Sequence, residues 1–217
     1  MPAFHAPEEM LLAYASGSLS EPLSLVVASH ISLDDTSREA VADFEEVGGA
    51  LIEEIEPVAL SSDALESILD KLDDLEAESS PSAPVGRDGL DLPPALRVYV
   101  GEDIEALKWR SLLRGVQEAE IPASDGEGSK ARLLRIAPGR AVPQHSHRGF
   151  EVTLVLEGAY RDGEEVYGRG DMQVAGDTVD HRPVVEGDVP CLCLVVNNAP
   201  IRLTGPLGRL IDPFIRY

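Results

Sequence analysis

The chain has 217 residues, 43% hydrophobic and 26% charged, which is ordinary for a globular protein with one large or two small domains. Its net charge of −21 argues against direct nucleic-acid binding, which needs a basic surface. No apolar run is long enough to span a bilayer, and no secretory signal is seen. We therefore expect a cytoplasmic protein without a membrane segment.

The negative charge is unevenly distributed. Residues 1–90 contain 20 acidic and 3 basic residues, a net charge of −17. Two interpretations remain open: the acidity serves solubility, or it serves a partner with a basic surface, such as a DNA-binding protein.

Residues 1–80 have the pattern of a helical domain. The first predicted helix spans residues 8–15 behind Pro7, and the second starts at Ser20-Glu21-Pro22. The third starts at a capping box over residues 36–39, and the fourth covers residues 62–78. Short amphipathic helices cannot each bury an apolar stripe alone, so we expect them to pack together or on a partner.

The chain then changes character. Residues 81–92 are rich in Ser, Pro and Gly and predict a linker. Residues 93–217 contain short alternating segments separated by turn residues, at 130–136, 151–156, 172–174, 179–185 and 191–196. The Asp162-Gly163 pair favours a two-residue hairpin turn. The predicted fold class is α+β: an N-terminal helical bundle followed by an antiparallel β-sandwich or barrel.

Three of the five histidines form a metal-ligand pattern with one glutamate. His145 and His147 are two residues apart, so on a strand their side chains point to the same face. Glu151 follows after a short turn, and His181 would complete the set from another strand. Zinc is the expected divalent metal, and iron, manganese or nickel suit the same ligands. Zinc with four protein ligands would be a closed structural site, whereas open positions would suit a redox metal or a sensing role.

The spacing of glycines around these ligands resembles the two-part cupin signature. The first motif, from Gly139 to Gly158, is complete, and in the second Gly170 and His181 keep their spacing. Gly176, Thr178 and Val185 depart from the usual turn residues but not from the ligands. The resemblance implies that residues 93–217 fold as a cupin, a jelly-roll β-barrel.

The N-terminal part resembles the ChrR family of anti-sigma factors, in which a small helical anti-sigma domain precedes a cupin domain. Two stretches carry the resemblance, namely residues 5–22 and 26–33. The resemblance implies an ECF-type sigma factor as partner and a response to oxidative stress.

One departure from this family concerns its N-terminal zinc site. The family motif joins an upstream histidine to a histidine, three residues, a cysteine, two residues and a second cysteine. His5 and His30 match the histidines, but Asp34 and Ser37 occupy the cysteine positions. Because thiolates supply much of the affinity for zinc, we predict no structural zinc here. The alternative is a weaker site formed by His5, His30 and Asp34.

Cys191 and Cys193 are two residues apart on a predicted strand, so their side chains share a face. We interpret them as small buried apolar residues. The alternative is a redox-sensing pair, which the family's link to oxidative signals implies.

Three functions are weighed for the whole chain. The leading hypothesis is an anti-sigma factor whose acidic helices occlude an ECF-type sigma factor and whose cupin senses a signal at its metal. The second is a metal-dependent cupin enzyme, such as a dioxygenase or isomerase, in which the same ligands serve catalysis. The third is a cupin binding module whose helices drive self-association into a homodimer.

Overall fold

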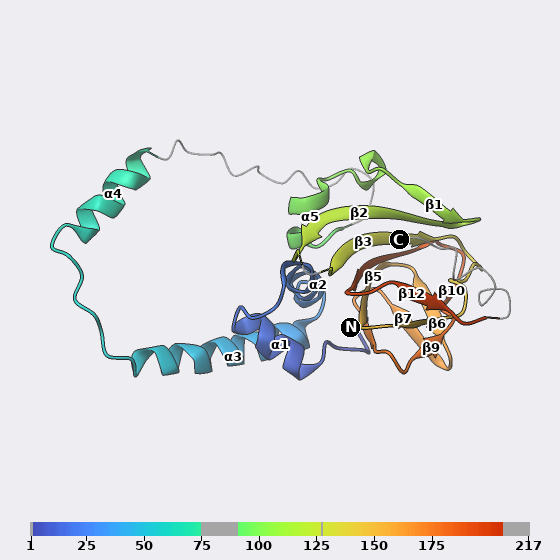
Figure 1. Ribbon diagram of the computed structural model, residues 1–217, viewed down its shortest axis with the longest axis horizontal. Helices are drawn as coiled ribbons and strands as arrows, with labels where there is room; N and C mark the ends of the chain where they lie inside the picture. Colours follow the sequence, from blue (N-terminus) through green and yellow to red (C-terminus); the bar gives the residue numbers. More distant parts are fainter. Residues whose placement is uncertain (1, 75–90, 127, 206–217) are drawn as a thin grey trace.

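The computed structural model describes residues 2–74, 91–126 and 128–205. Figure 1 shows N-terminal helices on one side of a body of antiparallel strands, which is the predicted α+β order. Most of the predicted linker and the end of the predicted cupin domain, residues 206–217, lie outside the described residues. No described helix is long and apolar enough to cross a membrane.

The helices of the N-terminal part are α1 (Glu8–Ala15), α2 (Glu21–Ile31), α3 (Asp35–Glu53) and α4 (Ala64–Asp74). The first two agree with prediction, with Pro22 in the first turn of α2. The predicted capping box at residues 36–39 is wrong. Asp34 caps α3 by accepting a hydrogen bond from the Ser37 N–H, so the helix starts one residue before Thr36.

A short helix, α5 (Pro94–Val100), and a 3₁₀ turn, η1 (Ile104–Ala106), lead into the strands. The strands are β1 (Arg110–Leu113), β2 (Val116–Ser124), β3 (Lys130–Ile136), β4 (His145–His147), β5 (Glu151–Glu157), β6 (Ala159–Asp162), β7 (Glu165–Gly168), β8 (Met172–Ala175), β9 (Asp180–His181), β10 (Val184–Glu186), β11 (Cys191–Asn197) and β12 (Ile201–Leu203).

These strands form three sheets rather than one closed barrel. The large sheet has the order β1-β2-β3-β11-β5-β8, and the two small sheets have the orders β10-β6-β7 and β12-β4-β9. All of their pairings are antiparallel. The small sheets cover one face of the large one in the cupin manner (Figure 1).

The other face of the large sheet is covered by helices. Val26 and Val27 of α2 share one core with Leu194 of β11 and Leu96 of α5, and all four side chains are fully buried. The opposite face of β11 presents Cys193 to a second core between the sheets. Strand β11 is apolar from Cys191 to Val196, as expected for a strand with both faces buried. The N-terminal helices thus share their core with the β domain.

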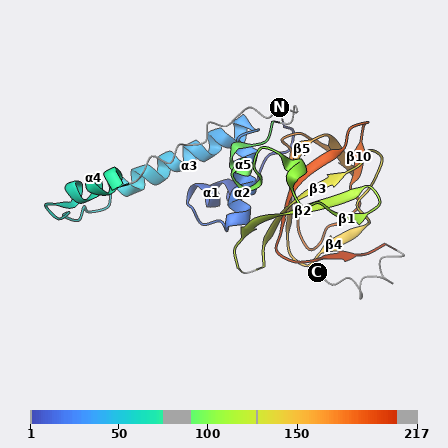
Figure 2. The same cartoon turned by 90° about the horizontal axis from the view of Figure 1, so that it is seen from above.

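The C-terminal half of α3 and the whole of α4 project away from this core. Figures 1 and 2 show α4 beyond the end of α3, at a distance from the sheets. Among the apolar positions of α3, Val41 is 4% exposed, whereas Val47 and Leu51 are each 61% exposed. The apolar stripe of α4 is also exposed. The helices were expected to bury these stripes against one another or against a partner. Helix α4 packs on no other described helix, so a partner remains as the means to bury its stripe.

Candidate metal centre

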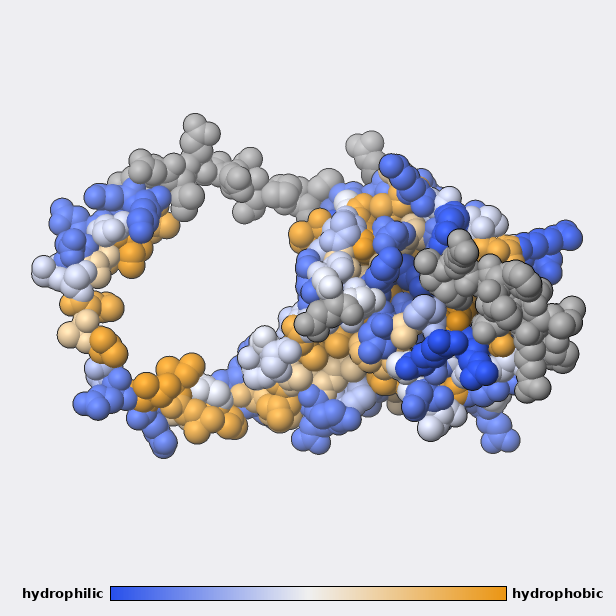
Figure 3. Space-filling model, viewed as in Figure 1, coloured by the Kyte–Doolittle hydropathy of each residue, from blue (hydrophilic) through white to orange (hydrophobic). Residues whose placement is uncertain are grey.

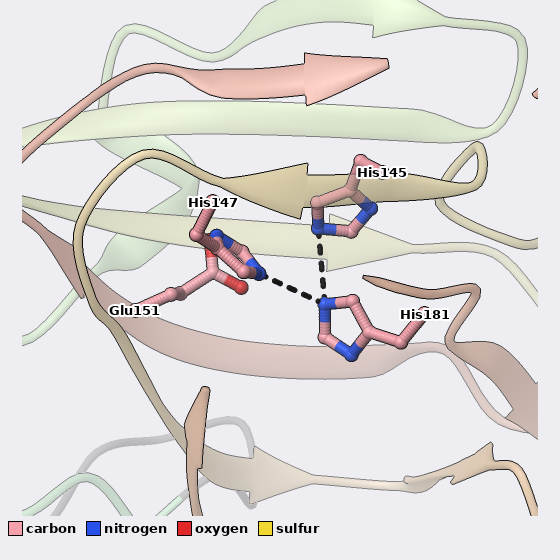
Figure 4. A group of neighbouring side chains, drawn as sticks. All are labelled: His145, His147, Glu151 and His181. Carbon is pink, nitrogen blue, oxygen red and sulfur yellow. Dashed lines mark hydrogen bonds and ion pairs between the residues drawn. The ribbon is translucent and has the colours of Figure 1, made fainter. Parts of the chain in front are cut away.

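Three strands bring the four predicted ligands together. His145 and His147 lie on β4, and His145 is the register partner of His181 on β9. Glu151 is the first residue of β5. Donor atoms from all four side chains lie within 4.8 Å of one another, and Figure 4 shows them converging on one point. As predicted, the two histidines of β4, which are two residues apart, point to the same side of the strand.

The turn between β4 and β5 is fixed by a contact with Asn198. The Phe150 N–H donates to Asn198 Oδ1 at 2.9 Å. A Cβ atom on Gly149 would lie 2.0 Å from that same oxygen, so a side chain at this position would expel Asn198. Glycine thereby lets the chain turn tightly enough for His147 and Glu151 to face the same point.

Hydrogen bonds determine which nitrogen of two histidines is available. His145 Nδ1 lies 2.8 Å from the Pro143 carbonyl oxygen, and His181 Nδ1 lies 2.6 Å from Asp162 Oδ2. A carbonyl and a carboxylate only accept, so each Nδ1–H is the donor and each Nε2 carries a bare lone pair. A carboxylate behind a ligating histidine also orients the ring and raises its basicity.

The three Nε2 atoms are close enough to share an ion. His181 Nε2 lies 3.1 Å from the Nε2 atoms of both His145 and His147. The bare lone pairs of His145 and His181 repel each other at this distance unless a cation lies between them. Two nitrogens bound at about 2.05 Å to one zinc ion, with about 98° between the bonds, would be about 3.1 Å apart. The donor set therefore fits a divalent metal.

Burial tunes the charges of these ligands. It lowers the pKa of His145 and of His147 to about 4, and the nearby His181 adds to both shifts. Burial also raises the pKa of Glu151, against the opposing effect of Arg132, whose Nη2 lies 3.6 Å from Glu151 Oε2. The imidazoles of His145 and His147 are thus neutral at physiological pH, which is the form that binds metals.

Several residues around the site were not predicted from the sequence. Asp162 was assigned to a hairpin turn, but it ends β6 and pairs with Glu165, so that the two turn residues are Gly163 and Glu164. Gly163 has a φ of 61°, the left-handed conformation that such a turn requires. The Asp-Gly signal thus located the hairpin correctly but hid the role of the aspartate. Arg132 and Asn198 gave no signal in the sequence.

Comparison with known proteins agrees with this architecture. A family model described as "ChrR Cupin-like domain" matches residues 99–200. The chain is 43% identical over 212 residues to the anti-sigma-E factor ChrR of Cereibacter sphaeroides, covering 98% of this chain and 97% of the relative. A crystal structure of Rhodobacter sphaeroides SigE in complex with the anti-sigma ChrR matches with a TM-score of 0.75 and 42% identity. That match covers 89% of this chain and 98% of the other.

The chain belongs to the ChrR family. The resemblance noted for the two halves separately therefore extends over nearly the whole length, and the order of helical and cupin parts is confirmed. Two features predicted from the ChrR resemblance remain to be located in the structure. They are the four positions of the N-terminal zinc motif and the cysteine pair.

The four N-terminal positions of the ChrR zinc motif come together in space. His5 Nδ1 lies 2.7 Å from Asp34 Oδ2, and His30 Nε2 lies 3.0 Å from Ser37 Oγ. The Ser37 hydroxyl donates to Asp34 Oδ2 at 2.6 Å. His30 Nδ1 donates to the Gly170 carbonyl at 2.9 Å, and its Nε2 accepts from the Ala6 N–H at 3.1 Å. Hydrogen bonds thus connect His5 and Ser37 to Asp34, while both ring nitrogens of His30 bond to backbone groups.

The charges of this cluster fit a hydrogen-bonded network. Burial lowers the pKa of His30 and outweighs the attraction of Asp34. For Asp34, burial raises the pKa, but hydrogen bonds from Ser37 and His5 outweigh it, so the pKa of the carboxyl is lowered. Neutral His30 and ionised Asp34 are therefore the stable forms at neutral pH.

Cys191 and Cys193 are both buried and free, with their Sγ atoms 3.6 Å apart. Their mutual hydrogen bond is the first cause, and burial the second, of a strongly raised pKa for Cys193. Oxidants react with the thiolate, so such a thiol is protected. This geometry favours the interpretation as core residues over the redox-sensing alternative.

Proposed function

We propose that this protein is a cytoplasmic anti-sigma factor that sequesters an ECF-type sigma factor by occlusion. Its N-terminal helices would cover the surfaces with which the sigma factor binds polymerase and promoter DNA. Its cupin would hold one zinc ion and respond there to an oxidative signal. Membership of the ChrR family supports the partner, and the structure offers a surface for it.

The observation that carries the proposal is an exposed apolar surface on the projecting helices. Figure 3 shows apolar patches along the end of α3, over residues 54–63 and on α4. Its members are between 51% and 87% exposed: Val47, Leu51, Ile52, Ile55, Val58, Leu60, Leu65, Ile68, Leu69 and Leu72. Ten large apolar side chains in one continuous stretch are unusual on a monomer and mark an interaction site. We call this stretch the apolar clamp.

The charge around the apolar clamp fits a basic partner. Residues 1–90 carry a net charge of −17, and acidic residues alternate with the apolar ones along α4. Complementary charge speeds and orients encounter, while the buried apolar contact holds the complex. Added salt should therefore slow association more than it speeds dissociation.

Co-purification tests the proposal. Each ECF-type sigma factor of the source genome is co-expressed in turn with the tagged full-length chain, which is purified at low salt. We expect one sigma factor to be retained. Ile68→Asp should weaken retention at least tenfold, because the apolar clamp then buries a charge. Ser67→Asp adds the same charge at the neighbouring, non-apolar position and should leave retention unchanged. Retention of no sigma factor, or equal loss in both variants, would contradict the proposal.

For the cupin we propose a sensing rather than a catalytic role, with zinc as the metal. Four protein ligands, with His145 2% and Glu151 9% exposed, would fill the tetrahedral coordination of one zinc ion and leave no open position for a substrate. X-ray absorption of the purified chain should show three nitrogen ligands and one carboxylate oxygen. A redox metal with bound water would instead favour the enzymatic alternative.

We also propose that the N-terminal cluster holds no zinc. The support is the hydrogen-bond network, which occupies both ring nitrogens of His30. Elemental analysis of the full-length protein should give one metal per chain. The variant His147→Ala with Glu151→Ala should give none. One metal remaining in that variant would place an ion elsewhere, with His5, His30 and Asp34 as the first candidates.

A further inference from the structure

We propose that residues 170–173, at the start of β8, couple the cupin metal centre to the N-terminal helices. This inference rests on the proposed function, because it names the route by which a change at the metal would reach the sigma-binding part. The four residues contact the helical part at one end and the hydrogen-bond shell of a metal ligand at the other.

The first three residues of this segment hold the N-terminus of the chain. Asp171 Oδ1 accepts hydrogen bonds from the N–H groups of Ala3 at 2.6 Å and Phe4 at 2.9 Å. The Met172 N–H donates to the Phe4 carbonyl at 3.0 Å. The Gly170 carbonyl accepts from His30 on α2. Both the chain entering α1 and helix α2 are thereby tied to one short segment of the β domain.

Gly170 permits this close approach. Its φ is 90°, which a residue with a side chain adopts only at a cost, and an added Cβ would lie 2.8 Å from Pro2 Cγ. The turn thus brings the N-terminus into contact with the cupin. Four hydrogen bonds between residues 170–172 and the N-terminal part define one docked arrangement.

The last residue of the segment reaches the metal site. Gln173 Nε2 donates to Asp162 Oδ2 at 2.7 Å, and the same oxygen accepts from His181 Nδ1 at 2.6 Å. Gln173 Oε1 accepts from the Tyr160 hydroxyl at 2.8 Å. Because a carboxylate only accepts, Asp162 fixes the direction of every hydrogen bond in the series that runs from Tyr160 through Gln173 and Asp162 to His181. A turn of the His181 ring would break the bond to Asp162 and release Gln173.

Aromatic rings provide a second connection between the same two ends. The Tyr160 ring stacks on Tyr167 with centroids 5.1 Å apart, and Tyr167 contacts Phe4 at 4.3 Å. Tyr160 therefore contacts Gln173 directly, and Tyr167 connects it to Phe4 of the docked N-terminus. Rings packed in this way move together rather than independently.

The physical consequence is reciprocal. An ion held by His181 fixes the Asp162 and Gln173 side chains and so stabilises the docked N-terminus. By thermodynamic linkage, docking of the N-terminus must raise the metal affinity by the same factor. Loss of the ion would loosen residues 2–6 and with them the start of α1 and the anchor of α2.

Hydrogen exchange of the full-length chain, without any sigma factor, tests the coupling. Amide protection of Ala3, Phe4 and Met172 is compared between zinc-saturated and chelator-treated protein. We expect zinc to increase protection about fivefold or more in the wild type, the lower end of typical coupling. Gln173→Leu breaks the hydrogen-bond chain without touching a ligand and should abolish the increase at saturating zinc.

Two further variants make the test independent of how well Gln173→Leu folds. Tyr160→Phe removes one hydroxyl from the chain and should reduce the increase. Glu165→Gln keeps both tyrosine rings and changes only an exposed partner of the Tyr167 hydroxyl, so it should retain the increase. Zinc that leaves the three amides unchanged in the wild type overturns the coupling, as does a full increase in both Gln173→Leu and Tyr160→Phe. Since no sigma factor is present, neither result bears on whether one is bound.

Discussion

The N-terminal cluster of His5, His30, Asp34 and Ser37 can be tested by restoring the two thiols of the ChrR zinc motif. Replacing Asp34 and Ser37 together by cysteine would restore the family's two thiols beside His5 and His30. The side chains already meet: the three relevant donor distances are 2.7, 3.0 and 3.3 Å. Neighbouring nitrogen and sulfur ligands of tetrahedral zinc are about 3.5 Å apart. A cysteine Sγ in place of Ser37 Oγ must therefore move away from His30 Nε2 by only about 0.5 Å. A sulfur at position 34 would lie one bond nearer the backbone than Asp34 Oδ2.

The expected magnitude follows from linkage. A second zinc site should raise the metal content from one to two ions per chain. At free zinc about 1,000 times the dissociation constant, binding adds about 4 kcal/mol to the free energy of unfolding. For a chain of this size, that raises the melting temperature by roughly 8–16 °C between chelated and zinc-saturated protein, beyond the change seen in the wild type.

Elemental analysis and thermal unfolding at fixed free zinc measure both effects. A control with Asp34→Ser and Ser37→Ala breaks the same hydrogen bonds but adds no thiol, so its zinc dependence should equal that of the wild type. A folded double-cysteine variant that still holds one metal per chain would refute the reasoning, because it would mean that these four positions do not form a zinc-sized site.

Other expectations concern the cupin. Asp162→Asn should lower zinc affinity about 10–100-fold, because it removes the carboxylate behind His181. In metal-free protein, the depressed pKa values of His145 and His147, about 4, mean that the unfolded state takes up protons first as the pH falls. The free energy of unfolding should therefore be highest above pH about 6.5 and fall towards pH 4. Both cysteine thiols should resist a thiol reagent in the native protein and react fully once it is unfolded.

Each of these has a direct check. Zinc affinity is measured by competition with a chromophoric chelator, with Asp180→Asn as the matched control: it makes the same change beside His181 but on an exposed side chain. Equal losses in the two variants would remove Asp162 from the site. Urea unfolding of chelator-treated protein gives the pH dependence, and a flat profile between pH 6.5 and 4 would contradict the neutral imidazoles. Rapid labelling of native protein would contradict the buried cysteines.

Local patterns in the sequence located the ligands because they depend on short-range geometry. His145 and His147 share a face for the same reason that any two residues two apart on a strand do, and the glycine spacing implied where Glu151 and His181 would follow. The helices α1 and α2 were equally visible, since caps and periodicity are local properties. At the start of α3 the predicted capping box was wrong, because the side chain of Asp34 is the one that reaches the free N–H of Ser37.

The sequence by itself thus determined which residues could bind a metal, that a helical part precedes a part rich in strands, and that the apolar stripes needed partners. It missed the short helix α5 and did not separate β9 from β10. Only the tertiary structure decided which partners they have: α2 lies on the sheet, while the apolar clamp remains exposed. It also decided that Ala3 meets Asp171, 168 residues along the chain, and that Gln173 meets Asp162. Periodicity reports which face of an element is apolar, but the contact that covers it depends on how the whole chain closes, which no local pattern records.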